Sequence, residues 1–267
     1  MIKLLFFTLF LCFNSIHSQN LKNENMKIFT YRLTYFSDST NTESSKQEDF
    51  DLQILGNKSC FVSTNYKFGY QNIRMMAASG QGLAVAAGNL MKLPKSAFRY
   101  SIYKENNDIA FYEKVYSFGL KYNEKASFDW KLSKEKKKID TYNCNKATLT
   151  YGGREWIAWY TTEIPISEGP YKFKGLPGMI IQLYDVKNQY NFSLIEVQAN
   201  KDYPIFYDES FNNYKEISRK EYFVTRDNLK NNYVNNVESQ GITFQAKDKA
   251  DIQRNINKKG NNPIELK

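Results

Sequence analysis

The chain has 267 residues and a formal net charge of +9 at pH 7, a length that suits one domain with a sizeable core. The positive residues are spread through Tyr- and Asn-rich sequence instead of gathering on one element, which argues against a nucleic-acid-binding module. The single histidine, His17, lies in an N-terminal segment that we expect to be removed. The mature chain would then lack Ser-His-Asp and Cys-His catalysis and histidine-ligated zinc. Phosphate-binding loops and dinucleotide fingerprints are absent from the sequence, and we expect no cofactor and no metal.

Residues 1–18 have the organisation of a secretory signal peptide. Lys3 gives a short positive region, residues 4–13 form an apolar run, and a polar stretch ends at the small residue Ser18. A membrane-spanning helix needs roughly 20 apolar residues, so this run is too short to remain as an anchor. We therefore expect cleavage after Ser18, a mature chain without a transmembrane segment, and a location in the periplasm or cell envelope.

Two cysteines, Cys60 and Cys144, remain after this cleavage. In an exported chain an even number of cysteines is typical of a disulfide. The alternative is a pair of buried free thiols, and spacing alone does not decide between the two.

Short alternating runs rich in aromatic residues predict β-strands along most of the chain. Residues 29–35, 50–54 and 59–63, with a turn at Gly56-Asn57, predict an antiparallel meander with one wet face. Further strands are predicted at 101–103, 109–115 and 128–132. The fold class expected is mainly β: a curved antiparallel sheet or half-barrel with one or two helices.

Four other segments depart from this strand pattern. Residues 74–92 are rich in Ala, Met and Gly and predict a short helix followed by a flexible flap. The Lys-rich run 134–138 indicates a solvated turn, with contact to an anionic surface as the alternative. Residues 217–231 have helical spacing, and Ser218 followed by Glu221 fits a capping box at the start of this segment. We predict one β-rich domain over 19–246 and a polar, poorly ordered tail over 247–267.

Gly152-Gly153 between two alternating runs predicts a tight hairpin, because both turn positions require positive φ. The register that follows pairs Tyr151 with Arg154 and places Trp156 and Trp159 on opposite faces, so both faces must be covered. For Arg154 we favour a side chain whose stem lies on aromatic surface while its guanidinium stays in water. The alternative is an arginine that binds a carboxylate ligand.

Pro177-Gly178 suits the central positions of a type II turn, since proline fixes φ and glycine accepts positive φ. Such a turn would begin a buried apolar strand over residues 179–184. The alternative is a loop whose exposed backbone N–H groups receive a ligand or peptide.

The run Gly175-Leu176-Pro177-Gly178, continued by Met179-Ile180 and preceded by residues 153–160, resembles the GLPGLI family. This family comprises exported proteins of Bacteroidetes, also described as a Porphyromonas-type family of unknown function. Met179 stands where the family usually has leucine, a volume-conserving exchange. The resemblance is dense over 128–185 and implies a cell-envelope location, but no activity or catalytic residue. The candidate binding or motif residues are Arg154, Trp156, Trp159, Tyr160, Gly175, Leu176, Pro177 and Gly178.

The chemistry left by this inventory favours a binding protein over an enzyme. Glu155, Glu163 and Glu168 lie near aromatic residues, as carboxylates of a glycosidase would, but Glu155 is expected beside a solvated turn. We predict an envelope protein that holds a lipid or peptide in an aromatic-lined groove, with an envelope protein as a further candidate partner. The alternative is a histidine-free envelope hydrolase of peptides, esters or glycosides.

Overall fold

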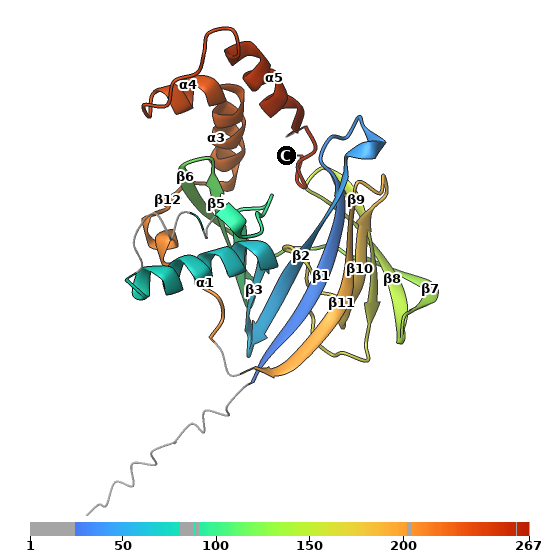
Figure 1. Cartoon of the computed structure of the whole chain (residues 1–267). Coiled ribbons are helices and arrows are strands. Elements are labelled where there is room, and N and C mark those ends of the chain that lie inside the picture. The colour runs from blue at the N-terminus through green and yellow to red at the C-terminus, as the bar shows by residue number, and fades with distance from the viewer. Residues whose placement is uncertain (1–24, 81–87, 89–90, 202–203, 260, 267) are drawn as a thin grey trace, which may run out of the picture.

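The structure is a computed structural model that describes residues 25–80, 88, 91–201, 204–259 and 261–266. Its central feature is a strongly bent, open sheet of twelve strands (Figure 1) in the order β12-β6-β5-β4-β3-β2-β1-β11-β10-β9-β8-β7. Neighbouring strands are antiparallel except for β12, which pairs with β6 in parallel. This confirms the predicted fold class of a mainly β, curved antiparallel sheet. Among the described residues, no helix is both long enough and apolar enough to span a membrane.

The strands and helices have the following bounds. The strands are β1 Met26–Phe36, β2 Ser45–Leu55, β3 Lys58–Ser63, β4 Tyr100–Glu105, β5 Asp108–Val115, β6 Phe118–Lys125, β7 Lys131–Ile139, β8 Tyr142–Tyr151, β9 Arg154–Thr161, β10 Met179–Asp185, β11 Tyr190–Lys201 and β12 Lys215–Glu216. The α-helices are α1 Thr64–Ala78, α3 Arg219–Asn231, α4 Tyr233–Glu238 and α5 Lys249–Lys259, and the 3-10 helices are η1 Thr42–Ser44 and η2 Glu209–Asn213.

The first three strands form the predicted antiparallel meander, but the face expected to be wet is largely covered, since Cys60 and Val62 are buried on it. Leu52 lies between Phe29 on one side and Phe61 on the other, and all three side chains are buried. The β4–β5 hairpin also forms where expected, with Asn106 at φ 51° in its turn. Asparagine tolerates this left-handed conformation better than most residues, which explains the turn.

The Lys-rich run 134–138 does not form the predicted turn. It lies in β7, at the edge of the sheet, where its lysines are exposed as expected. Lysines on an edge strand discourage pairing with another chain, which explains their presence in a strand. The strand predicted at 128–132 starts only at Lys131, and the Nε1 of Trp130, just before it, donates to the carbonyl of Lys174 at 2.9 Å.

The helices differ more from expectation than the strands. α1 begins at Thr64, earlier than predicted, because the hydroxyl of Ser63 caps it by accepting from the N–H of Tyr66. The flap predicted after this helix falls largely on residues 81–87 and 89–90, which lie outside the described residues. The capping box of Ser218 and Glu221 is confirmed at the start of α3.

The C-terminal region departs from the predicted poorly ordered tail. Residues 249–259 form α5, and beyond them Asn262 and Glu265 are buried. The sequence of this region is polar, but polar partners far along the chain hold Asn262 and Glu265, and sequence composition does not show such partners.

The main core lies on the inner face of the bent sheet. We use inner face for the face that carries Phe50, Phe61 and Phe111, and outer face for the one that carries Cys60 and Val62. Residues 162–178, here called the inner loop, connect β9 to β10 and add buried side chains to the inner-face core. Helix α3 packs on the same face, whereas α1 contributes aromatic rings to the smaller outer-face cluster.

Candidate functional site

A cavity of about 720 Å³ lies between the inner face of the sheet, α3 and residues 261–266. We call residues 261–266 the C-terminal strap. The cavity is lined by ten aromatic residues and ten polar or charged ones. The aromatic residues are Tyr35, Phe98, Tyr100, Phe111, Tyr116, Tyr122, Tyr171, Tyr190, Tyr222 and Phe223, and the charged ones are Lys46, Glu113, Arg226, Asp227, Lys230 and Glu265.

The aromatic rings lie close enough to form one continuous surface. Phe111 stacks on Tyr122 with ring centroids 4.9 Å apart, and Tyr222 meets Phe111 edge-on at 5.4 Å. Tyr100 extends this surface, at 5.5 Å from Phe111. The hydroxyl of Tyr100 is buried and has no hydrogen-bond partner among the described residues. A buried hydroxyl without a partner is costly, so this group is one that a bound molecule could satisfy.

Glu113 is the half-buried carboxyl in this aromatic lining. It lies on β5 directly opposite Tyr100 of β4, and its side chain accepts a hydrogen bond from the hydroxyl of Tyr222 on α3. Burial raises the pKa of Glu113 above its usual range, although the bond from Tyr222 and the positive charges of Arg226, Arg99 and Lys172 act against the rise.

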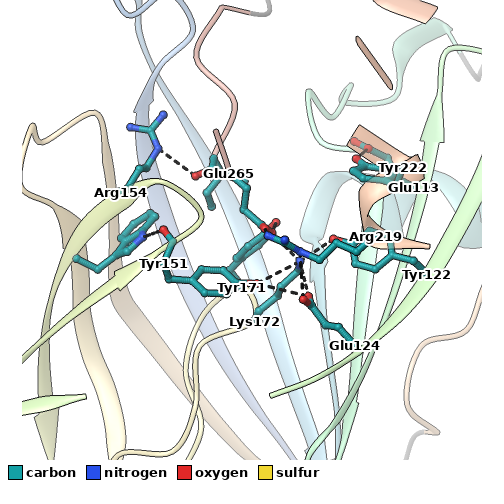
Figure 2. A network of polar contacts seen from close by, with 12 residues as sticks. Glu113, Tyr122, Glu124, Tyr151, Arg154, Tyr171, Lys172, Arg219, Tyr222 and Glu265 are labelled. Carbon is teal, nitrogen blue, oxygen red and sulfur yellow. Dashed lines mark hydrogen bonds and ion pairs between the residues drawn. The ribbon is translucent and has the colours of Figure 1, made fainter. Parts of the chain in front are cut away.

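A network of buried ions lies beside the cavity and surrounds Lys172 of the inner loop (Figure 2). Its ammonium group is 2.5 Å from Glu265 and 2.6 Å from Glu124, and it donates to the hydroxyl of Tyr122 at 2.6 Å. Arg219 of α3 pairs with the same two carboxylates. Two cations therefore balance two carboxylates.

Glu265 is ionised in this network. Burial alone would raise its pKa, but Lys172, the hydroxyl of Tyr171 and Arg219 together outweigh burial and lower it. The hydroxyl of Tyr171 donates to this carboxylate at 2.5 Å. The network thus joins the inner loop, β6, α3 and the strap, and it fixes one wall of the cavity.

A second buried pair fixes the other end of the inner loop. The ammonium group of Lys104 on β4 is 2.5 Å from Glu168 and donates to the carbonyl of Gly169 at 3.0 Å. Burial lowers the pKa of Lys104, and the negative charge of Glu168 opposes that shift. A second cavity of about 680 Å³ lies over the outer face of β3 to β6, beside residues 205–207.

Arg154 is buried and holds the C-terminal strap, so the predicted position of its guanidinium in water is wrong. It pairs with Asp185 at 3.0 Å and lies 4.9 Å over the ring centre of Tyr190. Its remaining donors reach the carbonyls of Pro263 and Ile264 at 2.7 and 3.0 Å. The local sequence does not show this role, because the strap is distant along the chain.

The hairpin that carries Arg154 has the predicted register. Tyr151 pairs with Arg154, and Gly152 and Gly153 have φ values of 60° and 77°. The backbone N–H of Leu266 donates to the carbonyl of Gly152 at 2.7 Å, so the strap also contacts the turn itself.

The Gly-Leu-Pro-Gly segment does not form the predicted type II turn. The N–H of Gly178 donates to the carbonyl of Leu176 at 2.7 Å, which makes a tighter γ-turn centred on Pro177. Gly178 is required because a Cβ atom there would be 2.0 Å from the carbonyl oxygen of Thr161. The N–H groups of Gly175, Gly178 and Met179 all have protein partners, and the segment begins the expected buried strand, β10.

The aromatic motif residues Trp156, Trp159 and Tyr160 are all buried. Trp156 packs against Phe173 of the inner loop at 4.9 Å, whereas Trp159 on the opposite face donates to the hydroxyl of Tyr184. Most of the motif residues therefore lie around the inner loop, Trp159 lies on the opposite face of the sheet, and the cavity is lined by other residues. Of the lining residues that sequence analysis missed, Glu113 had a usable signal, because strand alternation places it on the same face as Phe111.

Cys60 and Cys144 are buried free thiols, which is one of the two alternatives that the sequence left open. Their strands, β3 and β8, are separated in the sheet by β2, β1, β11, β10 and β9. Cys60 points to the outer face, where it packs with Val62. Burial raises the pKa of Cys60 to about 12 and that of Cys144 to about 11.

We expect both thiols to resist alkylation in the folded protein, because they are buried and almost fully protonated at neutral pH. Mass spectrometry after iodoacetamide treatment should show no added group on the native protein and two on the protein unfolded without reductant. An unfolded, unreduced sample that takes up none would contradict the free thiols.

The comparison with known families concerns the region just described. A family model described as "Protein of unknown function (Porph_ging)" matches residues 152–182. Residues 152–182 carry the Porph_ging pattern. The predicted resemblance to this Porphyromonas-type family is confirmed over that short segment, which spans the Gly-Gly turn, β9, the whole inner loop and the first part of β10.

Comparison of the whole fold finds similar solved structures. Two structures of PNGF-II, in space groups P21 and C2, have TM-scores of 0.50 and 0.48 and are 14% identical in sequence. The matches cover 74% and 73% of this chain but only 32% and 31% of PNGF-II, so the chain spans about a third of that protein's length. At this identity the similarity concerns the fold alone. No curated protein sequence matches the chain.

Proposed function

We propose that this protein is exported to the cell envelope and binds a small amphiphilic molecule in the aromatic cavity. The observation that carries the proposal is a cavity of about 720 Å³ whose lining combines ten aromatic residues with ten polar or charged ones. Sites for small molecules have volumes of roughly 300 to 1,000 Å³ and combine apolar walls with polar anchors, as an amphiphile requires.

Within this proposal we favour a lipid-like molecule over a peptide. The cavity lies on the face of a sheet, where the backbone N–H and C=O groups of β4 and β5 are already paired with one another. A peptide in this position would leave many of its own amides without partners, which costs free energy. An alkyl chain has no such groups and packs directly against aromatic rings.

Acid–base catalysis is the second candidate function, and Glu113 is the observation that favours it. A carboxyl with a raised pKa in a cavity can act as a general acid. Glycoside hydrolysis needs a second carboxylate, however, and the other two in the described lining are engaged: Asp227 with Arg226, and Glu265 with Lys172. Binding is therefore the better supported function.

The test is native mass spectrometry of protein purified without detergent from the cells that produce it naturally. We expect the native protein to carry additional mass that disappears on denaturation. The mass of the polypeptide itself should be that of a chain that begins at Gln19. Fragmentation of the released molecule distinguishes a lipid from a peptide. A polypeptide that retains residues 1–18 would contradict export.

A matched pair of variants links the bound mass to this cavity. Ala97 is exposed and lines the cavity, so Ala97→Trp should obstruct it and remove most of the bound mass. Ala77 is an exposed alanine of α1 outside the lining, and Ala77→Trp should retain the ligand. Equal occupancy in the two variants would contradict the proposed site.

A further inference from the structure

We infer that the molecule bound in the cavity carries a protonated amine, which pairs with the carboxylate of Glu113. This inference rests on the proposed function and specifies the chemical class of the ligand. It follows from where Glu113 lies, from how its neighbouring cations are engaged, and from the aromatic rings around it.

Glu113 is placed in the cavity by the register of the β4–β5 hairpin. It has Tyr100 opposite it on β4, and alternation along β5 puts it on the same face as Phe111 and Val115. Tyr222 from α3 donates to one of its carboxyl oxygens. A carboxyl is thus presented between aromatic rings contributed by the sheet and by the helix.

The cations nearest to Glu113 are committed to other partners. Arg226 pairs with Asp227 at 3.1 Å, and Arg99 donates to the carbonyl of Tyr116 at 3.2 Å. Lys172 belongs to the balanced network with Glu124 and Glu265. Among the described residues none forms an ion pair with Glu113 itself, although Lys46 and Lys230 also line the cavity, so a cationic ligand would supply a direct partner for its carboxylate.

The same aromatic cluster already surrounds one ammonium group. Lys172 lies 5.0 Å from the ring centre of Phe111 and 4.9 Å from that of Tyr122, and the rings of Tyr151 and Tyr171 are within 5.9 Å. Ring faces attract cations, and cages of aromatic rings are a known means of binding ammonium groups.

The aromatic rings of this cluster that line the cavity can bind a ligand ammonium group in the same way. Phe111 and Tyr122 also line the cavity, together with Tyr100, whose buried hydroxyl has no partner among the described residues. A ligand ammonium group donates hydrogen bonds and therefore suits both the Glu113 carboxylate and this hydroxyl.

Proton exchange provides a specific signature of this pairing. Burial raises the pKa of Glu113 against the opposing effects of Tyr222, Arg226, Arg99 and Lys172, and Tyr100 faces it from β4. A bound cation favours the ionised carboxyl, so binding should release a proton where Glu113 is protonated in the empty cavity. Affinity for the amine should then increase as pH rises through the raised pKa of Glu113.

Isothermal titration calorimetry with decylamine, decanol and decanoate tests the inference on the full mature chain. We expect decylamine to bind about tenfold more tightly than decanol, with decanoate weakest, and Glu113→Gln to remove the preference for the amine. The enthalpy of decylamine binding to the unchanged protein should vary with the ionisation enthalpy of the buffer, a result that needs no variant. Glu135→Gln, which changes an exposed carboxylate of β7 that pairs with Lys146 and lies outside the cavity lining, should retain the preference.

The outcomes separate this inference from the proposed function. If decanol and decylamine bind equally and Glu113→Gln changes neither, the inference is wrong and the amphiphile-binding function stands. A preference for decanoate would also overturn it. If none of the three probes binds, both the inference and the proposed function fail.

Discussion

Arg154→Ala lowers the free energy of unfolding by about 3 to 5 kcal/mol, the range found when one partner of a buried ion pair is removed. Both side chains of the pair are almost fully buried, at 4% exposure for Arg154 and 2% for Asp185. The substitution leaves the Asp185 carboxylate without its cation and frees the strap carbonyls of Pro263 and Ile264. Because the strap is a wall of the cavity, ligand should be lost in the same variant.

Urea denaturation of Arg154→Ala and of the unchanged protein measures the loss of unfolding free energy. Native mass spectrometry of the same two proteins measures the loss of ligand. Arg32→Ala is the control, since Arg32 forms an ion pair with Asp49 that is largely exposed. Exposed pairs contribute little to stability, so this variant should unfold close to the unchanged protein. A loss for Arg154→Ala no larger than for Arg32→Ala would show that the strap is not held as described.

Local signals in the sequence predict those parts of the fold that depend on neighbouring residues. Gly152-Gly153 sets the hairpin turn, and the register of β8 and β9 follows from it. Ser218 and Glu221 set the start of α3 in the same way. In both cases the partners that decide the conformation are within a few residues of one another.

The parts that sequence analysis misses depend on partners far along the chain. Arg154 bonds to the carbonyl of Ile264, a separation of 110 residues, so nothing near it indicates that its guanidinium is buried. Glu265 belongs to a polar stretch, and only Lys172 and Arg219 explain its burial. The cavity forms where β5, α3 and the strap meet, and no single segment predicts it.

The substitution Lys172→Met tests how strongly the inner loop depends on the ammonium group of Lys172. The side chain of Lys172 is fully buried between Glu124 and Glu265, and methionine preserves much of its length without its charge. In this variant the carboxylates of Glu124 and Glu265 keep only Arg219 as a cationic partner. We expect the free energy of unfolding to fall by about 3 to 5 kcal/mol at pH 7. The double variant Lys172→Met/Glu265→Gln removes one of the carboxylates and should recover part of that loss.

The dependence of this loss on pH identifies its cause. The pKa of Glu265 is lowered in the folded protein, so its pairing contributes stability above the unfolded value of about 4.3 and loses it as pH falls further. In Lys172→Met the carboxylates lack their cation, and protonation relieves their repulsion. The difference in unfolding free energy between the two proteins should therefore shrink as pH falls from 7 towards the acid range, as urea denaturation at several pH values can measure. A difference that stays constant with pH would mean that Lys172 stabilises the inner loop through packing, not through its charge.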